Sequence, residues 1–179
     1  METIYKERWE KPHVLDRRIP PEVVRSIMGR LRWLSKEIPQ KVHAACIRLQ
    51  FNAFHTCARY QQKNKLCPFC ANCNSEDRLE HFFQCTEIKK LFHPLWRQSL
   101  TSRFFFLKGD KEEMIAMSYG IYALYTIHND LRHDDRPGMI PLPMRWTRAF
   151  IDVKLGKHAK SVLHLLHGHF QHNNTRPNS

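Results

Sequence analysis

The segment that decides the fold, residues 67–85, has the sequence CPFCANCNSEDRLEHFFQC. It contains the spacing C-x2-C-x10-H-x3-C, formed by Cys67, Cys70, His81 and Cys85. A C-x2-C turn brings two thiolates to one side of a tetrahedral ion, and H-x3-C on the first turn of a helix supplies the other two donors. Three thiolates and one neutral imidazole fill the four positions of zinc and leave none for a catalytic water. The spacing therefore predicts a structural zinc site.

Two alternatives stay open for the same residues. Free buried cysteines beside a packed histidine would need no metal. An iron–sulfur site would use Cys67, Cys70, Cys73 and Cys85, since C-x2-C-x2-C is also a cluster spacing, but it would leave His81 unexplained. Cys73 is also a candidate substitute ligand for zinc. Because zinc binding contributes folding free energy, we expect a zinc module at about residues 65–97 to lose its structure under a chelator.

Composition and charge define the class of protein around this segment. The chain has 179 residues, with 29 Lys and Arg against 17 Asp and Glu, and a formal net charge of +12. A hydrophobic fraction of 42% excludes a disordered tail, and a mean hydropathy of −0.56 excludes an integral membrane protein. A pI of about 9.7 favours a polyanionic partner, either nucleic acid or an anionic membrane face.

The sequence also indicates a compartment. The first residues lack the apolar core of a secretory signal, and the longest apolar stretch, residues 114–127, is shorter than the roughly 20 residues of a membrane span. The six cysteines then favour metal binding in a reducing compartment over disulfides. We therefore expect a nuclear or cytoplasmic protein that is neither secreted nor inserted in a membrane.

Hydrophobic periodicity predicts a mainly α fold, a small helical domain around the zinc-stapled turn. Pro20 and Pro21 begin one helical pattern, which ends before Pro39, and a second pattern extends from Lys41 to Cys57. The two segments are expected to pack as an αα-hairpin. The apolar residues at helical spacing are Val23, Val24, Ile27, Met28, Leu31 and Leu34 in the first segment, and Val42, Ala45, Cys46, Leu49, Ala53 and Cys57 in the second.

Further elements are predicted downstream. A helix is expected over residues 86–100, and residues 104–107 are the strand-like run. Asp110 and Glu113 form a capping-box pattern before a long helix. The predicted organisation is an N-terminal arm at 1–19, a helical domain at 20–132, a linker at 133–143, and a basic C-terminal helix with a disordered tail at 144–179. The C-terminal helix is expected over residues 146–170.

The basic residues are concentrated in the first third of the chain. Residues 1–66 hold 14 basic and 6 acidic side chains. Together with Trp33, Phe51, Phe54 and Tyr60, they suggest a surface that follows phosphates and stacks on bases. The alternative is a solvated face over a core that contains Trp33 and Phe51. The candidate nucleic-acid-binding residues are Arg25, Arg30, Arg32, Lys36, Lys41, Arg48, Arg59, Lys63 and Lys65.

Catalytic signatures are not found in the sequence. No G-x-S-x-G motif, phosphate-binding loop or dinucleotide fingerprint places Ser, His or Asp in a reactive setting. His164, His167, His169 and His172 could bind a second metal, but such a tract is more often a basic helix end. We therefore expect a protein that is not an enzyme.

From Lys41 to about Trp96, the chain resembles the zinc-binding region that follows the polymerase domain of non-LTR (LINE-type) retrotransposon reverse transcriptases. The resemblance rests on the order and spacing of short motifs, and Ile121 to Arg132 is weakly similar to the helix that often follows. The matching residues are Arg48-Leu-Gln-Phe-Asn-Ala, Thr56, Arg59, Cys67-Pro-Phe-Cys70, Glu76-Asp77, Glu80-His81-Phe82, Cys85 and Leu95-Trp96.

This resemblance implies that Cys67, Cys70, His81 and Cys85 bind zinc, and that the module binds nucleic acid beside a polymerase. The polymerase signature itself is missing, because Asp134-Asp135 follows His133 in a polar stretch that contains Pro and Gly. The resemblance thus implies a detached, non-catalytic fragment with RNA or DNA as its partner. The alternative is a structural zinc-stapled component of a ribonucleoprotein or protein complex. A fragment that works only with a separate polymerase chain is a third hypothesis.

Overall fold

The computed structural model describes residues 20–51, 53, 54, 56, 66–70, 73–92, 107–133, 140–153, 155, 158 and 162. Within these ranges the chain forms helices and no strand, which confirms the predicted mainly α fold; an isolated antiparallel bridge joins Leu66 to Glu76. The predicted arm at 1–19, the strand-like residues 104–106 and the C-terminal tail lie outside the described residues. So do Cys57, Tyr60, the four C-terminal histidines, and Arg59, Lys63 and Lys65.

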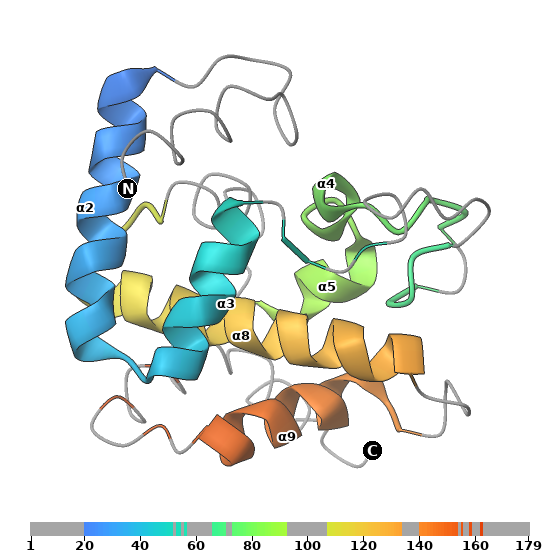
Figure 1. Ribbon diagram of the computed structural model, residues 1–179. Coiled ribbons are helices and arrows are strands. Elements are labelled where there is room, and N and C mark those ends of the chain that lie inside the picture. Colours follow the sequence, from blue (N-terminus) through green and yellow to red (C-terminus); the bar gives the residue numbers. More distant parts are fainter. Residues whose placement is uncertain are drawn as a thin grey trace, which may run out of the picture.

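Helices α2 (Pro21–Glu37) and α3 (Gln40–Gln50) form the predicted αα-hairpin. Pro21 is the first residue of α2, where its missing N–H lacks a helical partner in any case. Ile38 adopts an extended conformation before Pro39, as the residue preceding a proline tends to do, and α2 therefore ends there. Figure 1 shows the two helices antiparallel and meeting at one corner of the molecule.

Helix α8 (Lys111–His133) is the centre of the fold. Most of its residues from Met114 to His128 are buried, because α3 packs on one side and α9 (Leu142–Val153) packs on another. Figure 1 shows α9 running back along α8 in the opposite direction. No helix among the described residues is long and apolar enough to cross a membrane.

The beginning of α8 confirms the predicted capping box. The Glu113 backbone N–H donates to Asp110 Oδ1 at 2.8 Å, and the Asp110 N–H donates to Glu113 Oε2 at 3.1 Å. Gly109 precedes the box with φ of +142°, and a Cβ at this position would lie 2.6 Å from Glu113 Oε2. Glycine is therefore required for the chain to enter α8 in this way.

Several predicted helix boundaries were wrong. The second segment, predicted to extend to Cys57, forms a helix that ends at Gln50, since Ala53, Phe54 and Thr56 lie outside it. Both ends of the segment predicted as a linker at 133–143 are helical, since α8 includes His133 and α9 begins at Leu142. Pro143 lies in the first turn of α9, where proline is tolerated, although in the sequence it had indicated a break. Within the predicted C-terminal helix, α9 ends at Val153 and Leu155 lies outside it, next to the weak helix former Gly156, whereas Val162 is again helical.

A further boundary concerns the helix predicted over 86–100. Helix α5 (Thr86–Leu91) is shorter, because Phe92 is already extended with φ of −102° and ψ of 153°. Pro94 lies two residues further along the chain, and a proline disfavours helix just before it. Phe92 is nevertheless fully buried, and its ring packs against Trp146 of α9 at 5.1 Å between centroids.

Candidate metal centre

The four predicted ligands come together on a loop and two short helices. The Cys67 backbone N–H donates to the Ser75 carbonyl at 2.8 Å, which closes the loop beside the bridge between Leu66 and Glu76. Asn74 turns the chain back with φ of +46°, a conformation that asparagine adopts more readily than most residues. The sequence therefore places a tight turn where the C-x2-C segment must return toward the histidine.

The second half of the site differs from the prediction in one respect. His81 lies on α4 (Leu79–Phe82), whereas Cys85 is the N-cap of α5, so the two donors do not share one helix. Their spacing is still helical, because the Cys85 N–H donates to the His81 carbonyl at 2.7 Å. One turn of helical backbone thus brings the two donors to the same side.

The geometry fits a tetrahedral ion. The ligand atoms of Cys67, Cys70, His81 and Cys85 all lie within 4.8 Å of one another. Donors at 2.0–2.3 Å from a tetrahedral metal are separated by roughly 3.3–3.8 Å, so a small contraction suffices to coordinate one. The three cysteines are buried and His81 is partly buried. The four side chains could therefore hold a metal ion in a closed site.

Cys67 and Cys85 interact directly. The hydrogen bond between the two thiols lowers the pKa of Cys85 and raises that of Cys67, which burial raises further. One of the two sulfurs therefore gives up its proton more readily than a free cysteine does. A thiolate is the form that binds metal, so the pair is prepared for coordination.

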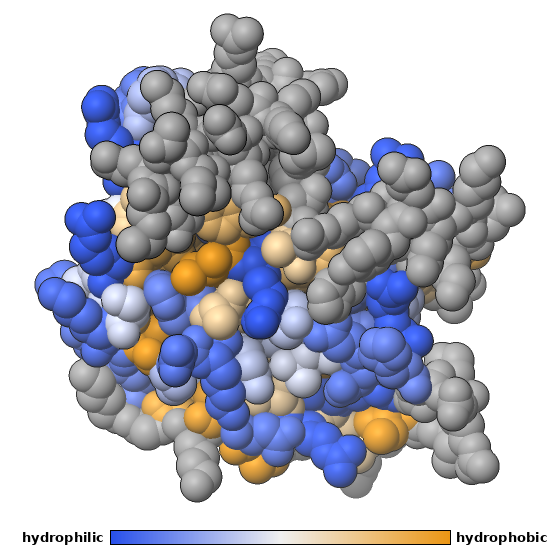
Figure 2. All heavy atoms as spheres, viewed as in Figure 1, coloured by the Kyte–Doolittle hydropathy of each residue, from blue (hydrophilic) through white to orange (hydrophobic). Residues whose placement is uncertain are grey.

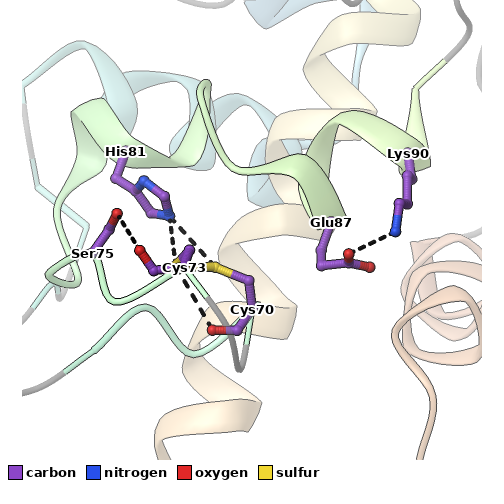
Figure 3. The surroundings of a disulfide bond; sticks show 6 residues. All are labelled: Cys70, Cys73, Ser75, His81, Glu87 and Lys90. Atoms are coloured by element: carbon purple, nitrogen blue, oxygen red, sulfur yellow. Dashed lines mark hydrogen bonds and ion pairs between the residues drawn. A yellow bond between two sulfur atoms is a disulfide. The ribbon is translucent and has the colours of Figure 1, made fainter.

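Cys73 forms a disulfide with Cys70 in the structure. Figure 3 shows the His81 ring directed at both sulfurs, with Nε2 at 3.6 Å from Cys70 Sγ and 3.3 Å from Cys73 Sγ. A sulfur in a disulfide carries no negative charge, and the disulfide and the complete set of three thiolates are therefore mutually exclusive. Cys73, a candidate substitute ligand in the sequence, therefore competes with the metal ion for Cys70.

Metal content should consequently depend on redox state. With a phosphine reductant, which cleaves the disulfide to two thiols, we expect one metal ion per chain by elemental mass spectrometry. One hydrogen peroxide oxidises the two thiols to one disulfide and is itself reduced to two waters, which take up the two thiol protons. This oxidation should lower the metal content severalfold.

Cys73→Ser is the matched variant for this experiment. It cannot form the disulfide with Cys70, and it should therefore retain more metal than the wild-type chain after mild oxidation. Equal metal loss from both proteins would contradict the role of Cys73 as a competitor for Cys70.

Residues 66–85, which carry the four candidate ligands and are called the metal loop below, are anchored to α8 by a buried pair of side chains, Asp77 and His128. The sequence did not predict this pair. His128 Nε2 lies 3.0 Å from Asp77 Oδ1 and 3.2 Å from Oδ2, and both side chains are buried. The ring also packs against Phe69 and Phe82, with centroids 6.0 and 5.1 Å away. No local sequence pattern identifies a partner for His128 that lies 51 positions earlier in the chain.

The predicted nucleic-acid-binding residues are distributed over two helices. Arg25, Arg32 and Lys36 are exposed on α2, where Arg30 is half-buried, and Lys41 and Arg48 are exposed on α3. Of the predicted stacking rings, Phe54 is 1% exposed and belongs to the core. Trp33 is half-buried, with Lys111 Nζ 5.9 Å from the ring centroid.

Comparisons with known proteins leave these features unassigned. Neither a family model, nor a curated protein, nor a solved structure matches this chain. What the structure itself establishes is a small helical fold that holds a Cys3His cluster able to bind a metal ion.

Proposed function

We propose that this chain is a non-catalytic nucleic-acid-binding module whose shape is held by one zinc ion, of the type found after the polymerase domain of LINE-type reverse transcriptases. Zinc is favoured because three soft thiolates and an imidazole match its ligand preference and leave no position open for substrate. The ion would act as a structural centre.

The observation that carries the proposal is a line of cations on one face of α2. Arg25, Arg32 and Lys36 follow each other at intervals of seven and four residues, which places them within about 20° of a common direction on the helix. All three are exposed, and within the described part of the chain none of them forms an ion pair. Gly29 is also exposed between Arg25 and Arg32 and leaves the helix backbone accessible to a large partner.

This arrangement suits a polyanion. The three charges extend over roughly 16 Å of helix at 1.5 Å per residue, a length that several consecutive phosphates of a nucleic acid strand can contact. Figure 2 shows that hydrophilic residues predominate over α2 and α3 on this side of the molecule. With a net charge of +12, the whole chain adds long-range attraction to the same partner.

The triple variant Arg25→Gln, Arg32→Gln, Lys36→Gln should bind RNA and DNA oligonucleotides more weakly. Because each lost phosphate contact removes one released counterion, the slope of log Kobs against log salt should become shallower by up to about 2 to 3. Fluorescence anisotropy at four or more salt concentrations, with the metal content checked in parallel, measures both quantities.

A control with the same net charge separates the line on α2 from charge in general. The variant Lys89→Gln, Lys90→Gln, Arg148→Gln removes three positive charges elsewhere on the described surface. Its slope of log Kobs against log salt should stay closer to that of the wild type. Equal slopes for the two variants would remove the α2 line from the binding surface, and metal without nucleic-acid binding would favour a structural role in a complex.

A further inference from the structure

A groove of about 500 Å³ lies between α3 and α8, away from the metal centre. Its walls carry two cations from α3, Lys41 and Arg48, and two rings from α8, Tyr122 and Tyr125. The volume lies within the range of small-molecule sites, which is roughly 300–1,000 Å³. The groove is thus large enough for one nucleotide.

The cations and the rings occur as two matched pairs. Lys41 Nζ lies 5.5 Å from the centroid of the Tyr122 ring, and the Arg48 guanidinium lies 5.0 Å from that of Tyr125. Lys41 and Arg48 are seven residues apart on one face of α3, and the two tyrosines are three residues apart on one face of α8. Two cation–aromatic pairs therefore lie in succession along the same groove.

The groove also continues the basic surface of α2. Lys36 is near the end of α2 and Lys41 near the start of α3, with the Ile38–Pro39 turn between them. Figure 1 shows these two helix ends meeting, and Figure 2 shows strongly hydrophilic residues over α3 beside paler residues of intermediate hydropathy along α8. A strand that follows the cations of α2 would reach the groove next.

We infer that this groove is a subsite for one unpaired nucleotide of a single-stranded nucleic acid. The tyrosine rings contact the face of the base, and Arg48 and Lys41 contact the flanking phosphates. Single strands are favoured over duplexes because their bases present free faces for stacking. The inference rests on the proposed function and narrows it to unpaired strands.

The test compares binding of labelled single-stranded 12-mers and of a blunt duplex of the same length. In the variant Tyr122→Leu, Tyr125→Leu, single-strand affinity should fall by about 10- to 100-fold, which corresponds to the usual loss on removing one or two stacking rings. Duplex affinity and the salt slope should change less than threefold. Tyr125→Phe keeps the ring and should bind single strands nearly as well as the wild type.

Met144→Ala is the control, because Met144 is an exposed apolar side chain on α9 that does not line the groove. It should leave single-strand binding within threefold of the wild type. Circular dichroism and thermal melting of each variant detect loss of fold, and the variant Arg48→Gln, whose side chain is exposed on α3, provides a second measurement that should lower single-strand affinity severalfold.

The outcomes separate the inference from the proposed function. If the wild type binds strands and duplexes alike and the tyrosine variant changes neither, the groove is not a base subsite, while the basic module stands. If it binds no nucleic acid at all, both fail. Competition by a free mononucleotide at concentrations near those of the 12-mer would identify a nucleotide pocket in place of a strand subsite and would overturn the inference.

Discussion

Replacing Cys85 by serine, or removing metal with a strong chelator, is expected to unfold the segment from residue 66 to 92. The free energy of structural zinc binding in small modules is of order 10–16 kcal/mol near neutral pH, which matches or exceeds the total stability of about 5–15 kcal/mol of an ordinary domain. The helices of this segment are too short to be stable by themselves, since α4 has four residues and α5 has six.

The effect should extend into the core. Phe82 and Ile88 flank the ligands and are fully buried, so loosening the metal loop exposes apolar surface that packs against the rest of the helices. A loss of even 4 kcal/mol would lower the melting temperature by roughly 8–16 °C for a domain of this size. Thermal melting followed by circular dichroism measures the shift, and hydrogen exchange shows where protection is lost.

Cys73→Ser is the matched control under reducing conditions, because it changes a cysteine of the same loop that is not one of the four candidate ligands. It should keep one metal ion per chain and a melting temperature near that of the wild type. Unchanged protection of residues 66–92 in the Cys85→Ser protein, or equal loss in both variants, would show that the fold does not depend on the Cys3His cluster.

Replacing Asp77 by alanine is expected to destabilise the fold by about 3–5 kcal/mol. The variant leaves the fully buried His128 Nε2 without its carboxylate, and breaking one side of a buried pair typically costs that much. At 2–4 °C per kcal/mol, the melting temperature should fall by roughly 6–20 °C. Urea denaturation measures the free energy of unfolding directly. The two values can be compared when the variant and the wild type have equal slopes of this free energy against urea concentration.

Two further variants test the pairwise origin of this effect. Asp77→Asn keeps a hydrogen-bond acceptor at the same place and should cost less than Asp77→Ala. The double variant Asp77→Leu, His128→Leu replaces both partners by apolar groups beside Phe69 and Phe82, and should recover part of the stability. If Asp77→Ala changes the free energy of unfolding by less than about 1 kcal/mol, the pair is not the anchor of the metal loop.

Local sequence signals were sufficient for the features that depend on neighbouring residues. The proline pairs and the apolar spacing predicted α2 to within a residue at each end, and Asp110 with Glu113 predicted the beginning of α8. The ligand spacing identified the four donors that the structure brings together. In each case the cause and the result lie within about 20 residues of one another along the chain.

Features that depend on distant residues could not be predicted in this way. The pairing of Asp77 with His128 and the groove between α3 and α8 arise only when helices from separate parts of the sequence pack together. Pro143 was misleading for a different reason: proline favours both a loop and the first turn of a helix, and only the packing of Trp146 and Phe150 on the core decides between them.

The separation of 51 positions between Asp77 and His128 has a consequence for biosynthesis. At 5–20 residues per second, a ribosome adds Cys85, the last of the four candidate ligands, about 2 to 9 s before it adds His128, which anchors the metal loop. During that interval the newly made loop has its cysteines but not the helix that buries them. Metal capture can therefore precede assembly of the helical core, and the nascent chain would acquire its ion as the first step of folding.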